Sequence, residues 1–209
     1  MAPDPHAIAS AAELWAIVGE PVERAITKET ASLDERGCAF IASSPFAMLA
    51  TTAADGTVDV SPKGGPGGFA RVLGPTRLVL PEFPGNRRLD GVQNLVERDG
   101  VGLIFVIPGI SETLRVNGRG RLTRDPGLRV ACAVDGKEPW FCIDIAVEQV
   151  FSHCGKAFLR SGLWKPECWP DPDVVTSPSN TISERARAET RPEREIRVEV
   201  EEEYRPLLY

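Results

Sequence analysis

Cationic side chains beside expected turns are the first candidates for chemistry. Lys63 follows one expected strand, Arg87 and Arg88 open an expected helix, and Arg115 lies within another expected strand. If these segments meet, the cations and the free N–H groups at the helix start would form a pocket suited to a phosphate. Charge-assisted hydrogen bonds contribute about 1.5–3 kcal/mol each, so three of them would hold a dianionic phosphate. Exposed arginines are usually only solvated, and the spacing leaves that alternative open.

A glycine-rich segment, KGGPGG at 63–68, invites comparison with nucleotide-binding loops. Gly65, Gly67 and Ala70 satisfy the formal spacing G-x-G-x-x-A. That fingerprint requires a helix immediately after the glycines, whereas the residues from 69 to 73 continue as a strand and Pro66 lies inside the motif. No GK[ST] follows the glycines, which excludes a P-loop. The segment is therefore interpreted as a flexible hairpin loop.

Metal and nucleophile chemistry find little support. His153 and Cys154 are adjacent, but no CxxC or HxxxH spacing accompanies them or the distant Cys142 and Cys168. The second histidine, His6, lies near the N-terminus, so His153 is the histidine expected in the folded core. No orienting group for a catalytic pair is evident. We predict no metal site, and catalytic residues stay unassigned.

The elements that must position the cations are mainly strands. The sequence holds 19 glycines and 18 prolines without a collagen-like period, an excess typical of turn-rich β structure. Asp55-Gly56 separates runs 46–52 and 57–61, which predicts a hairpin. Further strands are expected at 69–73, 77–80, 101–107, 113–123 and 140–150. The pattern favours around six short strands in a small antiparallel barrel.

Two longer helices are expected beside these strands. The first spans 21–36, with Gly37 as its C-cap. The second follows PEFPGN, with Asn86 as its N-cap. Its apolar face would consist of Leu89, Val92, Leu95 and Val96. A short helix is expected between the last two strands.

Charge and cysteine content limit partners and compartment. The formal net charge is −6, which argues against nucleic acid and anionic membranes as partners. The 5 cysteines are odd in number and scattered, a usage typical of reduced thiols. No leader and no apolar stretch of about 18 residues is evident. These features predict a soluble cytoplasmic protein.

The last forty residues differ in composition from the rest. A Pro-rich stretch precedes a densely charged segment of mixed sign. One interpretation is a solvated helix or frayed tail. The other is an arm that packs on a second subunit through Tyr204, Leu207, Leu208 and Tyr209, and the apolar end favours the arm slightly.

Four segments, in order, resemble a known family. They are SPFAMLATTAADGTVDVSPKGG, PEFPGNRRLDGVQNL, VGLIFVIPGISETLRVNGRGRLT and HCGKAFLRSGLW. Together they resemble the pyridoxamine 5'-phosphate oxidase-related FMN-binding family over roughly 14–169. The resemblance implies a mainly β fold, a six-stranded antiparallel FMN-binding split barrel with flanking helices. It divides the chain into an N-terminal helical segment at 1–36, the barrel domain at 37–165 and an extended C-terminal arm at 166–209.

The resemblance also implies a homodimer with two FMN sites at the subunit interface. Ser61 and Lys63 would lie near the ribityl phosphate or the ring, and Asn86 and Arg88 in a second phosphate-binding turn. Arg115 takes the place of the arginine in the family's Q-V-R-V-x-G strand.

A late motif, KAFLRSGLW, completes the cofactor residues that the resemblance implies. Arg160 and Trp164 would reach the cofactor of the partner subunit. An indole supplies a flat apolar face that suits a position beside a flavin.

Departures from the family pattern narrow the expected activity. Only the final lysine of R-x-V-L-L-K is kept, and Leu89 and Gly91 replace a serine and a lysine after the asparagine. Thr113 replaces the glutamine of Q-V-R-V, and the C-terminal R-L-x-P motif does not occur. These differences argue against vitamin B6 oxidation and leave FMN binding as the expectation.

The leading hypothesis is an FMN-dependent oxidoreductase acting on an unidentified small-molecule substrate. One alternative is a split-barrel protein that binds another cofactor, a deazaflavin or haem, with His153 as the haem ligand. Another is a non-catalytic flavin sensor, and a third is a plain dimeric scaffold.

Overall fold

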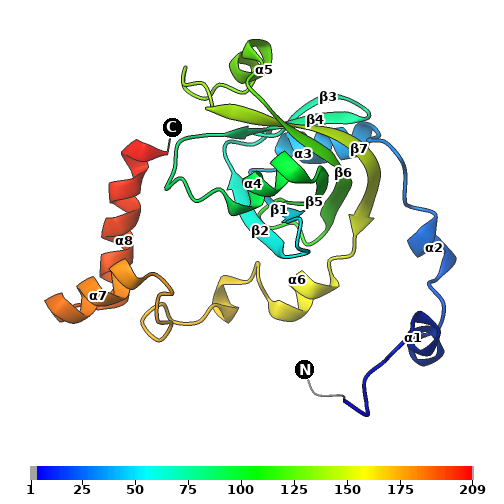
Figure 1. Cartoon of the computed structure of the whole chain (residues 1–209). Helices are drawn as coiled ribbons and strands as arrows, with labels where there is room; N and C mark the ends of the chain where they lie inside the picture. The colour runs from blue at the N-terminus through cyan, green and yellow to red at the C-terminus, as the bar shows by residue number, and fades with distance from the viewer. Residues whose placement is uncertain (1–3, 209) are drawn as a thin grey trace.

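A curved antiparallel sheet forms the centre of the molecule in the computed structural model, which describes residues 4–208 (Figure 1). The strands are β1 (Phe46–Thr52), β2 (Val58–Gly64), β3 (Arg71–Gly74), β4 (Arg77–Glu82), β5 (Gly100–Val106), β6 (Thr113–Thr123) and β7 (Phe141–His153). They pair in the order β2-β1-β5-β6-β7-β4-β3. The mainly β, antiparallel expectation is confirmed.

The expected number of six strands is wrong, because the described sheet has seven. Each of the seven runs expected from sequence, including 69–73 at the short edge strand β3, overlaps one of these strands, so the error lies in the six-stranded barrel and not in a missed strand. The sheet is also not closed by backbone pairing, since β2 and β3 stand at opposite ends of the strand order.

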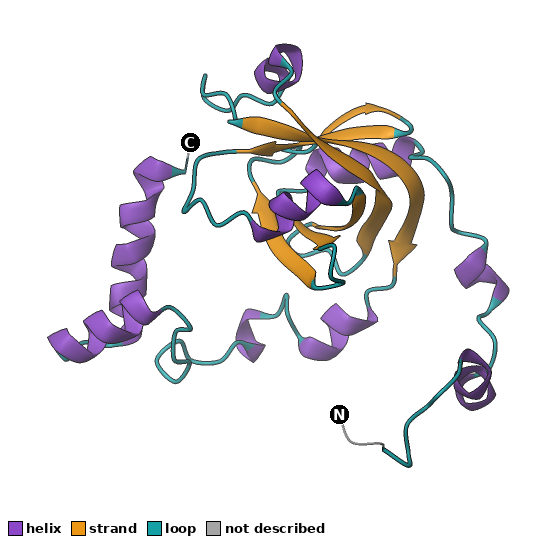
Figure 2. Cartoon of the chain, viewed as in Figure 1, coloured by secondary structure: helices purple, strands orange, loops and turns teal. Residues whose placement is uncertain are grey.

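The helices surround the strands, as the purple ribbons of Figure 2 show. They are α1 (Ala11–Val18), α2 (Glu23–Ile26), α3 (Glu35–Ser43), α4 (Asp90–Glu97), α5 (Pro126–Ala131), α6 (Lys156–Ser161), α7 (Asn180–Glu189) and α8 (Glu193–Tyr204), with short 3-10 turns at Pro166–Cys168 and Arg205–Leu207. α3 packs against β3 and β6, whereas α4 packs against β1, β2 and β6. α1 buries none of its residues.

The main core lies on the inner face of the sheet. Alternation along the strands places Leu49, Leu103 and Val116 in one cross-strand row, and all three are buried. Phe105 occupies the next inward position of β5 and is fully buried. Burial of such side chains contributes about 1.5–3 kcal/mol each relative to exposure.

The first expected helix is wrong in its extent. Residues 21–36 contain only the single turn α2 before α3 begins at Glu35. The Asp34 side chain caps α3 by accepting a hydrogen bond from the Gly37 N–H, at 2.7 Å. Gly37 therefore lies in the first turn of a helix and does not end one.

The second expected helix corresponds to α4. It begins at Asp90, four residues after Asn86, which was expected to be its N-cap. Leu89 is the N-cap of α4, while the Asn86 side chain accepts a hydrogen bond from the Arg88 N–H, at 3.0 Å, in the preceding turn. The apolar face includes Val92 and Leu95, but Val96 is 72% exposed. Asn86 thus shapes the turn before the helix.

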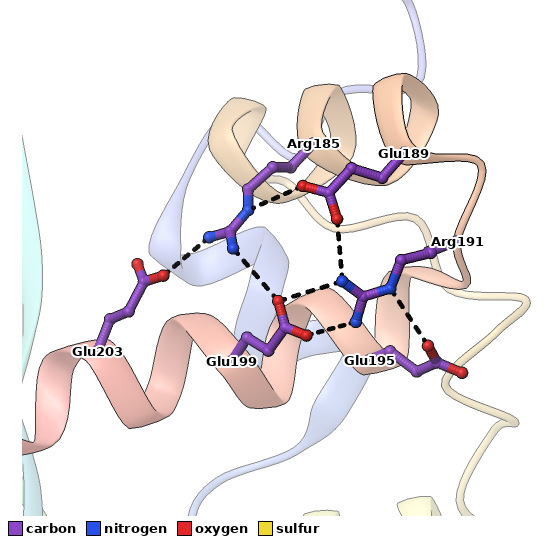
Figure 3. A network of polar contacts seen from close by, with 6 residues as sticks. All are labelled: Arg185, Glu189, Arg191, Glu195, Glu199 and Glu203. Atoms are coloured by element: carbon purple, nitrogen blue, oxygen red, sulfur yellow. Dashed lines mark hydrogen bonds and ion pairs between the residues drawn. The ribbon is translucent and has the colours of Figure 1, made fainter.

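The C-terminal segment forms a helical hairpin, α7–α8, in agreement with the helical alternative for this charged segment and not with a frayed tail. Ile182, Ala186, Ile196 and Val200 make a small hydrophobic cluster of its own. Ion pairs also connect the two helices. Arg185 and Arg191 each pair with several glutamates, including Glu199 (Figure 3). Of the four arm residues named from sequence, Tyr204 and Leu208 are exposed, the side chain of Leu207 is not described and Tyr209 lies outside the described residues.

Candidate functional site

Polar side chains line the inward positions of β2 at every second residue. Asp59, Ser61 and Lys63 are half-buried, whereas the residues between them are exposed. Their cross-strand partners on β1 are Thr51, Leu49 and Ala47, whose side chains are buried on the inner face. β2 is an edge strand in the described sheet, so backbone N–H and C=O groups on its outer side have no strand partner and are available to a ligand.

The start of α4 lies directly on this polar face. A Cβ built at Gly91 would lie 3.2 Å from the Thr51 Oγ1 and 3.8 Å from the Ser61 Oγ. Thr51 donates a hydrogen bond to the Gly91 carbonyl at 2.8 Å, and the Asn94 amide donates to the Asp59 carboxylate, also at 2.8 Å. Glycine at position 91 and these two hydrogen bonds fix the first turn of α4 beside the Ser61 hydroxyl.

No side chain caps the start of α4. Within the described structure, Val92 and Gln93 donate their N–H groups to the Leu89 carbonyl, which leaves the N–H groups of Asp90 and Gly91 pointing out of the helix end. Such N–H groups, together with the helix dipole, attract an anion. This end of α4 is therefore a suitable place for a phosphate.

The turn that leads into α4 carries the two arginines of PGNRR. Arg87 has a backbone φ of +63°, a left-handed conformation that is uncommon outside glycine. Arg88 is 80% exposed, and its guanidinium donates to the Asp90 carboxylate at 2.7 Å. That hydrogen bond raises the pKa of Arg88 above its already high ordinary value, so the side chain stays charged.

Lys63 has a carboxylate partner that the sequence analysis did not identify. Its Nζ lies 2.5 Å from the Glu82 Oε2, and the two side chains are only 12% and 14% exposed. Lys63 belongs to β2 and Glu82 to the end of β4, two strands that share no backbone ladder. This ion pair spans the open seam of the sheet, and it makes the site less basic than its cations alone would suggest.

Arg115 lies on the opposite face of the sheet from Lys63. The register across β2, β1, β5 and β6 aligns Lys63 with Leu114, so the neighbouring residue Arg115 faces outward. Its guanidinium carbon lies 5.0 Å from the centroid of the Phe151 ring. Within one chain, the cations of the expected pocket are therefore divided between two faces.

Arg160 and Trp164 belong to the segment around α6, below the sheet in Figure 1. Arg160 is exposed and donates to the Lys156 carbonyl of its own helix at 3.3 Å. Trp164 donates its indole N–H to the Ile110 carbonyl at 2.9 Å and stacks on Phe158 with ring centroids 5.6 Å apart. These contacts hold the segment against the loop between β5 and β6.

Three residues of the site, Glu82, Gly91 and Asn94, were not predicted from the sequence. Glu82 gives no local signal, because its partner is 19 residues away in the chain. Gly91 and Asn94 lie one helical turn apart on the face of α4 that meets β1 and β2, and that spacing could have indicated a buried polar contact.

The metal and haem expectations can be compared with the described residues, 4–208, which include His153. Within that range, no group of three or more His, Cys, Asp and Glu side chains is arranged to hold a metal ion. His153, expected in the core, is exposed at the last position of β7. No helix among the described residues has the length and apolar character needed to cross a membrane.

Residues 33–154, well over half of the chain, match the sequence profile of the family described as pyridoxamine 5'-phosphate oxidase. The chain belongs to this family. The matched region of the pyridoxamine 5'-phosphate oxidase family extends from just before α3 to just after β7, so it contains the whole sheet and α4. No curated protein gives a significant match.

Solved structures that are similar to this chain match somewhat more than half of it. HupZ of Group A Streptococcus is 18% identical, with a TM-score of 0.47, and the match covers 57% of this chain and 93% of that one. The general stress protein 26 of Bacillus anthracis is 12% identical (TM-score 0.42; 55% and 88% covered). An FMN-binding protein of Syntrophomonas wolfei is 11% identical (TM-score 0.44; 55% and 81% covered). Similarity of this degree does not transfer a ligand or a reaction.

Proposed function

We propose that this member of the pyridoxamine 5'-phosphate oxidase family is an FMN-dependent oxidoreductase, a cytoplasmic homodimer that acts on a small-molecule substrate. The observation that carries the proposal is the contact between β2 and α4, which sets the Ser61 hydroxyl beside the uncapped helix start. The family match covers both elements. A hydroxyl, a helix N-terminus and adjacent arginines are donors that suit a flavin phosphate.

The residues present fit FMN. The phosphate would bind the N–H groups of Asp90 and Gly91, with Arg88 and the Asn86 turn around it. Because the Arg88–Asp90 pair is exposed and exposed pairs contribute only about 0–1 kcal/mol, a phosphate can displace Asp90 from Arg88. Ser61 and Lys63 would supply hydrogen bonds to the remainder of the cofactor, with Glu82 holding Lys63 in position.

Bound FMN would supply hydride or electron transfer, and the chain would bind, orient and shield it. The inner face beside β2 offers apolar side chains, among them Leu49 and Leu103, that exclude water from the neighbourhood. We assign no acid or base to the protein.

A homodimer accounts for an apolar surface on the outer face of the sheet. Met48, Val58, Val60 and Ile104 are 46%, 63%, 61% and 37% exposed there, on the adjacent strands β1, β2 and β5. Grouped exposed apolar side chains are typical of protein interfaces. Arg115 faces outward near them, and in the dimer we propose that it, Arg160 and Trp164 contact the cofactor of the partner subunit.

The deciding experiment is the absorbance spectrum of the purified full-length protein, followed by mass spectrometry of the ligand released on denaturation. FMN absorbance and the FMN mass are expected. A deazaflavin mass, or a Soret band after haemin addition that is lost in His153→Ala, would replace FMN with the other cofactor. Colourless protein that binds no added FMN in a titration would overturn the proposal.

A further inference from the structure

Three arginines line one cavity on the outer face of the sheet, away from the contact of β2 with α4. Arg77, Arg119 and Arg121 come from β4 and β6, and Asp99 and Asp144 line the same cavity of about 380 Å³. Three guanidiniums and two carboxylates thus line the cavity, and a third carboxylate, Glu148, pairs with Arg119 beside it. Ile143 and Ile145, on either side of Asp144, are buried in the main core, which fixes Asp144 on the opposite, outer face.

Asp144 holds two of these guanidiniums in place. It is only 5% exposed, and its two oxygens accept hydrogen bonds from Arg77 at 2.8 and 3.1 Å. Arg121 donates twice to the Oδ2 of the same carboxylate, at 3.1 and 2.8 Å. A buried carboxylate between two arginines limits their freedom, so a ligand would meet donors that are already ordered.

Each of the three arginines retains unused hydrogen-bond donors. A guanidinium carries five N–H groups. Among contacts within the described structure, Arg77 and Arg121 each use two of them, and Arg119 uses two on Asp99 and Glu148. Arg121 is 76% exposed, so its remaining N–H groups are accessible.

The cavity shares two lining residues with a larger one. Asp99 and Arg119 also line a neighbouring cavity of about 860 Å³, where Leu95 and Val96 supply apolar side chains and Glu97 and Arg98 one charge of each sign. Val96 is 72% exposed there, at the C-terminal half of α4. Apolar and small side chains next to the arginines leave room for the organic body of an anion.

We propose that this groove, defined by Arg77, Arg119, Arg121, Asp144, Asp99 and the apolar wall at Val96, binds a small organic dianion. The anionic head, a phosphate monoester or a dicarboxylate, would bind the three guanidiniums, whose forks match its oxygens. The eight residues of α4 separate its two ends by about 12 Å, so the groove is a second site beside the one proposed for FMN.

The test is isothermal titration of the purified full-length protein with phenyl phosphate and, in a separate arm, with succinate. Saturable binding of at least one probe is expected, and the stronger one identifies the head group. Arg121→Gln should weaken that binding about tenfold, since a charge-assisted hydrogen bond is lost. Arg121 is largely exposed, so this variant should fold normally, which thermal unfolding will check.

A matched control distinguishes binding in the groove from nonspecific attraction of the anionic probe to positive charge. Arg194 is an exposed, ion-paired arginine of the C-terminal hairpin, and Arg194→Gln should bind the probe like the wild type. A second comparison uses Arg88→Ala, which should also retain probe binding. Absence of saturable binding, equal affinity in Arg121→Gln and wild type, or loss of binding in Arg88→Ala instead would each overturn the proposal. The last result would assign the probe to the turn before α4.

Discussion

Lys63 of β2 and Glu82 of β4 form an ion pair, 2.5 Å between Nζ and Oε2, across the seam where the sheet is not closed by backbone hydrogen bonds. Both side chains are largely shielded from water. The pair therefore fixes the edge strand β2, and with it Ser61, relative to the end of β4 and the turn that follows.

Removing one partner of this pair should destabilise the protein. Lys63→Met leaves the Glu82 carboxylate largely buried without its cation, and we expect a loss of about 1–3 kcal/mol in the free energy of unfolding, measured by urea denaturation. The double variant Lys63→Met/Glu82→Leu should recover part of the loss. Equal stability of the single variant and the wild type would show that the pair does not hold the seam.

Arg88 should contribute to flavin retention through its charge and position. Arg88→Ala is expected to raise the dissociation constant for FMN about tenfold, because one charge-assisted hydrogen bond to the phosphate disappears. Arg98→Ala is the matched control at the other end of α4, where the Arg98 side chain donates to the Ala54 carbonyl. An equal effect of both variants in a fluorescence titration would contradict the assigned phosphate position.

Gly91 should tolerate no larger residue without cost. In Gly91→Ala the added methyl group would lie 3.2 Å from the Thr51 Oγ1. The Thr51 side chain cannot easily move away, because it donates a hydrogen bond to the Gly91 carbonyl. We expect α4 to shift from β1, the free energy of unfolding to fall by about 1 kcal/mol and FMN affinity to fall with it. Gly100→Ala meets open space and serves as the control. Unchanged stability and affinity of Gly91→Ala would refute the close contact.

Asp144 should make stability depend on acid pH. Hydrogen bonds from Arg77, the largest cause, and from Arg121 lower the pKa of this carboxyl below its ordinary value of 3.8, against the opposing effect of burial. Its contribution is therefore fully present above pH 3.8 and is lost as the pH falls through the lower folded-state pKa. Urea unfolding between pH 2 and pH 7 should show a steeper acid decline for the wild type than for Asp144→Asn. Parallel curves would exclude Asp144 as a source of this decline.

The strands could be predicted from sequence because their signals are local. Asp55-Gly56 closes the β1–β2 hairpin with Gly56 at a φ of +89°, and the expected strand 113–123 coincides with β6. One error concerns two neighbouring signals, because the pattern predicts a helix that ends at Gly37, whereas Asp34 is the N-cap with which α3 begins.

The grouping of the site residues required the tertiary register. Whether Arg115 shares a face with Lys63 depends on three strand pairings, and a shift of one residue in any of them would reverse the answer. The Lys63–Glu82 pair depends on how far the whole sheet curls. Neither relationship has a counterpart in the local sequence.

The separate hydrophobic cluster of α7–α8 has a consequence for how the chain unfolds. Among the described residues, the buried cluster around Ile196 is separate from the main core, so the hairpin and the sheet need not unfold together. The hairpin can open and reclose while the sheet stays intact, and the stretch before Asn180 is then the place where a protease would first separate the two. Loss of the C-terminal helices would in that case leave an ordered sheet that retains the contact of Ser61 with α4.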